Sequence, residues 1–222
     1  MNEVLWRFPH IGEQTFKKLK NKALVKCKTV GRSWNDFIVN EKFYEQRVKY
    51  ENLQKDVDGW GDTPLHKAAK TGDLKKCKLI IDNVENKNPK CKYGFTPLHW
   101  AASNGHLSIC QLIVDNIQDK NPKNVLGFTP LHGAAIKGHF EIFKLIFDNV
   151  EDKNPMSENY FYTPLHFAAQ HGHFEICKFI VDNIQGTNLF SIGLHFAIKY
   201  GHHQIASYMK SKIEKLENDL SN

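Results

Sequence analysis

Twelve histidines are the side chains of this sequence with the widest potential for chemistry. Imidazole nitrogens bind a metal ion or transfer a proton when further ligands or a nucleophile converge with them. Most of these histidines, however, occupy two positions that recur along the chain, which indicates a structural role. One position holds His66, His99, His132, His166 and His195, and the other holds His106, His139, His173 and His202.

The pair His171 and His173, one residue apart, is the best candidate for a metal site. Such a site needs a third and usually a fourth ligand, and no nearby cysteine or acidic cluster supplies one. Another repeat position holds Cys77, Cys110 and Cys177. This position holds a Phe in the third copy, so it is expected to lie in the core. Because phosphate-binding loops, H-E-x-x-H and G-x-S-x-G are also absent, we predict no cofactor, no metal and no enzymatic activity.

The composition is that of a folded globular protein with a basic N-terminal quarter. Of the 222 residues, 41% are hydrophobic, but no apolar run approaches the roughly 18–20 residues of a membrane helix, so we expect no membrane partner. Residues 1–57 carry 12 Lys and Arg against 7 Asp and Glu, whereas residues 58–222 carry 18 against 17. A basic segment can meet nucleic acid or an acidic protein. Without an Arg-rich run or an RNA-binding signature, we predict no nucleic-acid partner.

The elements that position these side chains form an internal repeat. The string Thr-Pro-Leu-His begins at Thr63, Thr96, Thr129 and Thr163, at steps of 33, 33 and 34 residues. A degraded fifth copy ends at His195. Each copy continues with Ala-Ala, or Ala-Ile in the fifth, and a glycine follows three residues later.

One unit of the repeat predicts a pair of short helices. Thr63 is a good N-cap, the following Pro suits the first helical position, and Gly72 suits a left-handed stop. A second apolar helix then follows over residues 74–81, and Asn83 can take a left-handed stop after it. One such pair cannot bury its own apolar face, whereas stacked copies can. The sequence therefore predicts a solenoid whose surface is the working part.

These motifs resemble the ankyrin repeat across residues 58–222, with copies at 58–90, 91–123, 124–157, 158–190 and 191–222. The resemblance implies an all-α ankyrin-repeat solenoid of about five repeats with short hairpin loops. It also implies that the Thr-Pro-Leu-His histidines link loops of neighbouring repeats. Phe161 stands where the turn glycine is usual. The fifth copy lacks about four residues of its hairpin, and residues 210–222 resemble a polar helical C-terminal cap.

The resemblance places target binding on the concave face of the array. Hairpin positions three residues and one residue before each Thr carry mostly aromatic side chains: Trp60, Asp62, Tyr93, Phe95, Leu126, Phe128, Tyr160 and Tyr162. Positions after the Ala pair add Lys70, Asn104, Lys137 and His171. An exposed aromatic row can anchor a partner protein. The alternative is that neighbouring hairpins pack these rings against one another. We assign Trp100, Phe167 and Phe196 to stacking between repeats.

Residues 1–57 do not repeat, and residues 1–45 predict short amphipathic helices. The segment 23–34 (A-L-V-K-C-K-T-V-G-R-S-W) and the earlier Phe-Pro pair resemble the F-box, and residues 46–57 are expected to form a helical connector. The resemblance implies binding to a Skp-type adaptor of cullin–RING ubiquitin ligases. The candidate adaptor-binding residues are Phe8, Pro9, Ile11, Leu19, Leu24, Val25 and Val30. The alternative is a helical cap on the first repeat.

These resemblances predict a substrate receptor that recruits a target protein to an SCF-type ubiquitin ligase. A ligase-independent ankyrin scaffold with a helical cap is the alternative, and a microbial or viral effector would use the same chemistry. Five cysteines, an odd number without a C-x-x-C pair, indicate reduced thiols. We therefore expect the protein in the cytoplasm or the nucleus.

Overall fold

The computed structural model describes residues 57–158, 161–184 and 187–220. In these ranges the chain forms ten helices and no strands. The first helices of the successive pairs, which we call the inner helices, are α6 (Pro64–Thr71), α8 (Pro97–Ser103), α10 (Pro130–Lys137), α12 (Pro164–His171) and α14 (Thr187–Lys199). The second, outer helices are α7 (Leu74–Ile81), α9 (Leu107–Val114), α11 (Phe140–Asp148), α13 (Phe174–Asn183) and α15 (His203–Leu220).

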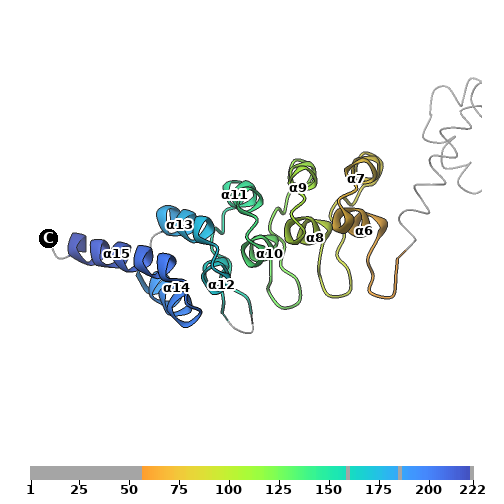
Figure 1. The fold of residues 1–222 in the computed structure, drawn as a ribbon. Helices are drawn as coiled ribbons and strands as arrows, with labels where there is room; N and C mark the ends of the chain where they lie inside the picture. Colours follow the sequence, from red (N-terminus) through yellow and green to blue (C-terminus); the bar gives the residue numbers. More distant parts are fainter. Residues whose placement is uncertain (1–56, 159–160, 185–186, 221–222) are drawn as a thin grey trace, which may run out of the picture. The chain divides into compact units, whose positions relative to one another are not determined.

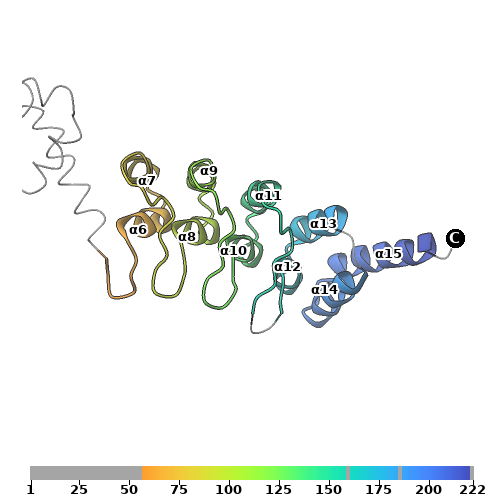
Figure 2. The ribbon, with the colours of Figure 1, turned by 180° about the vertical axis from the view of Figure 1, so that it is seen from behind.

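The helix pairs stack side by side, as the two opposite views show (Figure 1 and Figure 2). The hairpin loops extend from the row of inner helices, on the side away from α7, α9 and α11. The Ala pairs of the inner helices are buried, for example Ala101 and Ala102. Because alanine has a small side chain, consecutive inner helices can approach closely. The core therefore runs along the array, as a solenoid requires.

The predicted core position of the cysteines is confirmed. Cys77, Cys110 and Cys177 are buried, and Phe143 is fully buried at the same position of the third repeat. Burial raises the pKa of the Cys77 and Cys110 thiols to about 12. A thiol that stays protonated is a poor nucleophile, so these cysteines contribute to packing.

The helix ends agree with the sequence in one respect and differ in another. Gly72 ends α6 with a φ of 80°, which confirms the predicted left-handed stop. The left-handed conformation predicted for Asn83 is wrong, because Phe161 is the only non-glycine residue with positive φ in the described ranges. Instead, the Asn83 side-chain Nδ2 donates to the Leu79 carbonyl at 2.8 Å. A side-chain amide thus satisfies one of the free carbonyls at the end of the helix.

The predicted linking role of the Thr-Pro-Leu-His histidines is confirmed in the first three repeats. The Thr96 backbone N–H donates to His99 Nδ1 at 3.0 Å, and His99 Nε2–H donates to the Phe128 carbonyl of the next hairpin at 3.1 Å. One nitrogen accepts and the other donates, so the imidazole is neutral. His66 and His132 make the equivalent bonds to the next hairpin, at 3.0 and 3.1 Å.

The linking role fails in the last two copies. His166 Nδ1 accepts from the Thr163 N–H, but its buried Nε2 has no hydrogen-bond partner among the described residues. His195 is exposed in the middle of α14. The physical reason is that the fifth copy has no Thr-Pro start and lacks part of its hairpin, so that α14 runs on as one helix.

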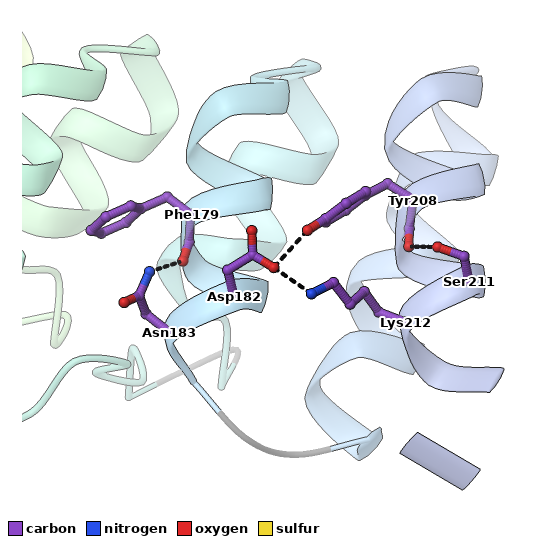
Figure 3. Close-up of polar contacts among 6 residues, drawn as sticks. All are labelled: Phe179, Asp182, Asn183, Tyr208, Ser211 and Lys212. Atoms are coloured by element: carbon purple, nitrogen blue, oxygen red, sulfur yellow. Dashed lines mark hydrogen bonds and ion pairs between the residues drawn. The ribbon is translucent and has the colours of Figure 1, made fainter. Parts of the chain in front are cut away.

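The C-terminal pair closes the array with a long helix. α15 extends to Leu220 and confirms a helical tail as far as that residue. Figure 3 shows its contacts with α13: the Tyr208 hydroxyl donates to Asp182 Oδ1 at 2.6 Å, and Lys212 Nζ lies 2.5 Å from the same oxygen. The Phe174 and Tyr208 rings meet edge to face, with centroids 5.8 Å apart. Buried Ile205 and Met209 complete this cap.

The predicted F-box-like unit at 1–45 and all seven of its candidate adaptor-binding residues lie outside the described residues, as does the connector up to residue 56. Among the helices that the structure describes, none combines the length and the apolar character needed to cross a bilayer.

Candidate protein-binding surface

The hairpin tips present large apolar side chains to solvent. Trp60, Tyr93, Leu126 and Phe161, which we call the tip row, are exposed by 64%, 48%, 45% and 66%. The predicted Tyr160 lies outside the described residues. Exposed apolar side chains that recur along one edge are typical of a protein interaction site.

Backbone hydrogen bonds hold neighbouring hairpins in register. The Lys92 N–H donates to the Trp60 carbonyl and the Val125 N–H to the Tyr93 carbonyl, both at 3.1 Å. The Glu158 N–H continues the series to the Leu126 carbonyl at 3.1 Å. The tip row therefore stands on a connected backbone, which lowers the entropy lost when a partner binds.

Ring packing and exposure occur together at the first tips. The Trp60 and Tyr93 rings lie 5.6 Å apart between centroids and are tilted by 41°. Both nevertheless keep about half or more of their surface in solvent. The two interpretations of the aromatic row are thus compatible, because these rings support one another and still offer a face to a partner.

The residues just before each Thr are half-buried and pack toward the inner helices. Ring centroids lie 5.5 Å apart for Phe95 and Trp100, and 5.4 Å apart for Phe128 and Phe167. The pair of Tyr162 and Phe196 follows at 5.2 Å. Phe128 and Tyr162 therefore contribute to the stacking of neighbouring repeats, whereas Phe95 packs on Trp100 of its own repeat. Asp62, at the same position in the first hairpin, is also half-buried.

The predicted positions after the Ala pairs are all exposed: Lys70, Asn104, Lys137 and His171. Lys70 Nζ lies 4.6 Å from the centroid of the Trp100 ring, a cation–π distance. The side-chain amide of Asn104 already makes one hydrogen bond, because its Nδ2 donates to the Trp100 carbonyl at 2.8 Å. Desolvation and the neighbouring His173 lower the pKa of His171, so its imidazole is neutral at pH 7.

The His171 and His173 rings stack with centroids 6.1 Å apart. His173 Nε2 is already bonded to the Ile136 carbonyl at 3.0 Å. In the part of the chain that the structure describes, no group of three or more His, Cys, Asp or Glu side chains is placed to hold a metal ion.

Sequence reasoning missed three exposed apolar residues on the hairpins. Phe161, Val125 and Met156 are exposed by 66%, 57% and 51%. Phe161 was visible as a departure from the turn glycine, and its φ of 54° shows that it keeps the left-handed turn despite its Cβ. Because such backbone strain clusters at functional sites, we add Phe161 to the candidate binding residues.

A repeated all-helical array with a rigid, exposed apolar edge defines a protein interaction module of the solenoid class. A family model of ankyrin repeats, in three copies, matches residues 36–124 and 116–191. The chain therefore belongs to the ankyrin-repeat family, whose fold is typically a binding scaffold without catalytic activity. A comparison with curated proteins finds no match.

Proposed function

We propose that this chain is a substrate receptor of an SCF-type cullin–RING ubiquitin ligase. The N-terminal segment would bind a Skp-type adaptor, and the ankyrin array would hold a target protein. The observation that carries the proposal is the F-box-like segment 23–34 on the N-terminal side of an ankyrin array. Residues 1–57 contain 12 basic and 7 acidic residues. This positive net charge is complementary to an acidic adaptor and so supports the proposal.

The ankyrin array supports the second half of the proposal. Its tip row offers aromatic side chains on hydrogen-bonded hairpins, and Trp and Tyr are favoured in the centres of protein interfaces. The ligase would then act by proximity, because a bound target has its lysines held near a ubiquitin-loaded enzyme of another subunit. No side chain of this chain takes part in bond making. We place the complex in the cytoplasm or the nucleus, since a ligase of this type works where thiols are reduced.

Adaptor binding is the direct test. The wild-type chain and a Pro9→Ala/Leu24→Asp/Val25→Asp variant are co-purified with a Skp-type adaptor at about 10 µM each. We expect a stable complex with the wild type only. The matched control is Trp60→Ala, which changes the tip row and should keep the adaptor. Circular dichroism reports whether each variant keeps its helices. If the wild type does not bind, the ligase proposal is refuted.

A ligase-independent ankyrin scaffold is the second candidate. The family match begins at residue 36, inside the segment 1–45 that we interpret as F-box-like. This overlap favours an N-terminal segment that belongs partly to the repeat array and caps it. The same co-purification separates the two candidates, because a scaffold would bind its partner through the tip row and leave the adaptor unbound.

A further inference from the structure

We propose that the target segment bound by the array is acidic, with apolar residues among its carboxylates. The proposal rests on the target-binding part of the function above and adds the chemistry of the partner. The surface concerned, which we call the inner face, consists of the tip row and the exposed side chains in the last turns of the inner helices. Charge complementarity between this face and the partner is the basis of the inference.

The inner helices contain no carboxylate. The sequences of α6, α8, α10, α12 and α14 include no Asp or Glu. The outer helices and the loops after them hold most of the acidic residues of the array, such as Glu141, Asp148 and Glu175. The same outer helices and loops also hold most of the lysines, such as Lys75 and Lys144, so the acidic and basic residues there nearly balance. The inner helices, by contrast, carry cations without carboxylates.

Three exposed lysines recur in the last turns of the inner helices. Lys70, Lys137 and Lys199 lie in the last turns of α6, α10 and α14, and each is exposed. None of the three forms an ion pair among the described residues, where the recorded pairs are Lys210–Glu214 and Lys212–Asp182. Ammonium groups that lack an ion pair and recur along one face attract a partner with carboxylates at matching intervals.

Aromatic rings lie beside two of these lysines. Lys70 Nζ is 4.6 Å from the Trp100 ring centroid, and Lys199 Nζ is 5.6 Å from that of Tyr200. Each ring holds an ammonium group at a defined place, which lowers the entropy lost when a carboxylate binds. The inner face thus combines cations with apolar surface.

The acidic residues of the hairpins modify this face locally. Asp58 stands in the first hairpin, where its Oδ1 accepts the N–H groups of Trp60 and Asp62 at 3.0 Å each. These bonds lower the pKa of its carboxyl, so Asp58 keeps its negative charge, and Asp62 adds a second carboxylate to this hairpin. Lys92 lies on the next hairpin and donates to the Gly59 carbonyl at 2.7 Å. Glu158 is the acidic residue of the fourth hairpin. The excess of cations is thus largest on the inner helices, beside the hairpins.

The spacing of the repeats indicates the form of the segment. Packed helices lie about 8–10 Å apart, and an extended chain advances about 3.3 Å per residue. Every third residue of an extended segment therefore meets the next repeat. A segment with an apolar residue at every third position and acidic residues between them would contact the tip row and the lysines together. A nucleic acid fits less well, because its affinity comes mainly from neutralised phosphates and three lysines neutralise about three of them.

The test measures fluorescence anisotropy with the full-length chain and a labelled peptide of about five Glu-Glu-Phe units. A Lys-Lys-Phe peptide and a single-stranded oligonucleotide of similar length are the comparison probes. We expect the wild type to bind the acidic peptide with a dissociation constant of about 10 µM or tighter, and the basic peptide at least about tenfold more weakly. Binding should weaken as salt rises from about 50 to about 500 mM.

Two charge-matched variants locate the site. Lys70→Glu/Lys137→Glu/Lys199→Glu should weaken peptide binding by at least about tenfold. The control, Lys75→Glu/Lys144→Glu/Lys178→Glu, places the same charge change on exposed positions of the outer helices and should change binding by less than about twofold. Both variants keep residues 1–57 unchanged, so the basic N-terminal quarter contributes equally to both.

Three results would overturn the inference. The first is no binding of the acidic peptide at about 100 µM. The second is an equal loss in both variants, which would mean attraction to net charge alone. The third is tighter binding of the oligonucleotide than of the acidic peptide, with that binding lost only in the Lys70→Glu/Lys137→Glu/Lys199→Glu variant. This result would indicate that the inner face binds a nucleic acid. Adaptor co-purification is a separate measurement, so an acidic peptide that fails to bind leaves the ligase proposal standing.

Discussion

Lowering the pH from 7 to 5 is expected to destabilise the ankyrin array strongly. Burial lowers the pKa of His99, His132 and His166 from 6.5 to about 4 in the folded chain, although carbonyl contacts at His99 and His132 oppose the shift. The pKa of His66 is lowered as well, for the same main reason. Protonation of Nδ1 would abolish its ability to accept the Thr N–H.

The sign and the size of this loss of stability follow from the histidine pKa values in the unfolded chain, 6.5, and in the folded chain, about 4. As the pH falls below 6.5, the unfolded chain binds protons that the folded chain does not, so stability is full above 6.5 and decreases toward pH 4. In this window each of these histidines lowers the free energy of unfolding by about 1.4 kcal/mol for every pH unit. From pH 6.5 to 5 the loss is about 2 kcal/mol for each, and about 6 kcal/mol for the three. This is comparable with the whole stability of a small domain, about 5–15 kcal/mol.

Urea unfolding followed by circular dichroism at pH 7 and at pH 5 measures the effect. His132→Gln removes one buried imidazole and should reduce the difference between the two pH values by about 2 kcal/mol. His203→Gln, at an exposed position, is the control and should leave the difference unchanged. If His132→Gln keeps the wild-type difference, buried histidines do not cause the acid sensitivity. NMR titration of the wild-type imidazoles gives the folded pKa values directly.

Three other changes test single features. Phe161→Gly should raise the free energy of unfolding by about 1 kcal/mol, because it relieves a φ of 54°; a lower melting temperature would contradict the strain. Gly138→Ala should destabilise by about 2 kcal/mol or more, seen as a lower urea midpoint, because its φ is 73° and its Cβ would lie 2.5 Å from His173 Cε1. Thiol reagents should modify the buried cysteines only after urea unfolding, and fast labelling of the folded chain would contradict their burial. These cysteines are Cys77, Cys91, Cys110 and Cys177.

The sequence alone predicted the repeat architecture because its determinants are local. Thr63 at the N-cap, the following proline and Gly72 at the left-handed stop define the first inner helix within ten residues. The same signals recur in the next three copies, and each repeat needs only its neighbours to bury its apolar face. The core position of the cysteines was predictable for the same reason, since Phe143 shares it.

The tertiary structure decided what depends on contacts between repeats. The sequence could not show that His166 Nε2 would lack a partner, because that bond depends on the hairpin of the next repeat. Nor could it decide between packing and exposure for Trp60 and Tyr93, whose rings do both.

The charge of the inner face also depends on how the repeats are arranged in the tertiary structure. The lysines of α6, α10 and α14 share one row without carboxylates only when the inner helices stand together. Local sequence determines where each helix begins and ends, since caps and turns act over a few residues. The hydrogen bonds that link the repeats join residues about 30 positions apart, which folding alone brings into contact.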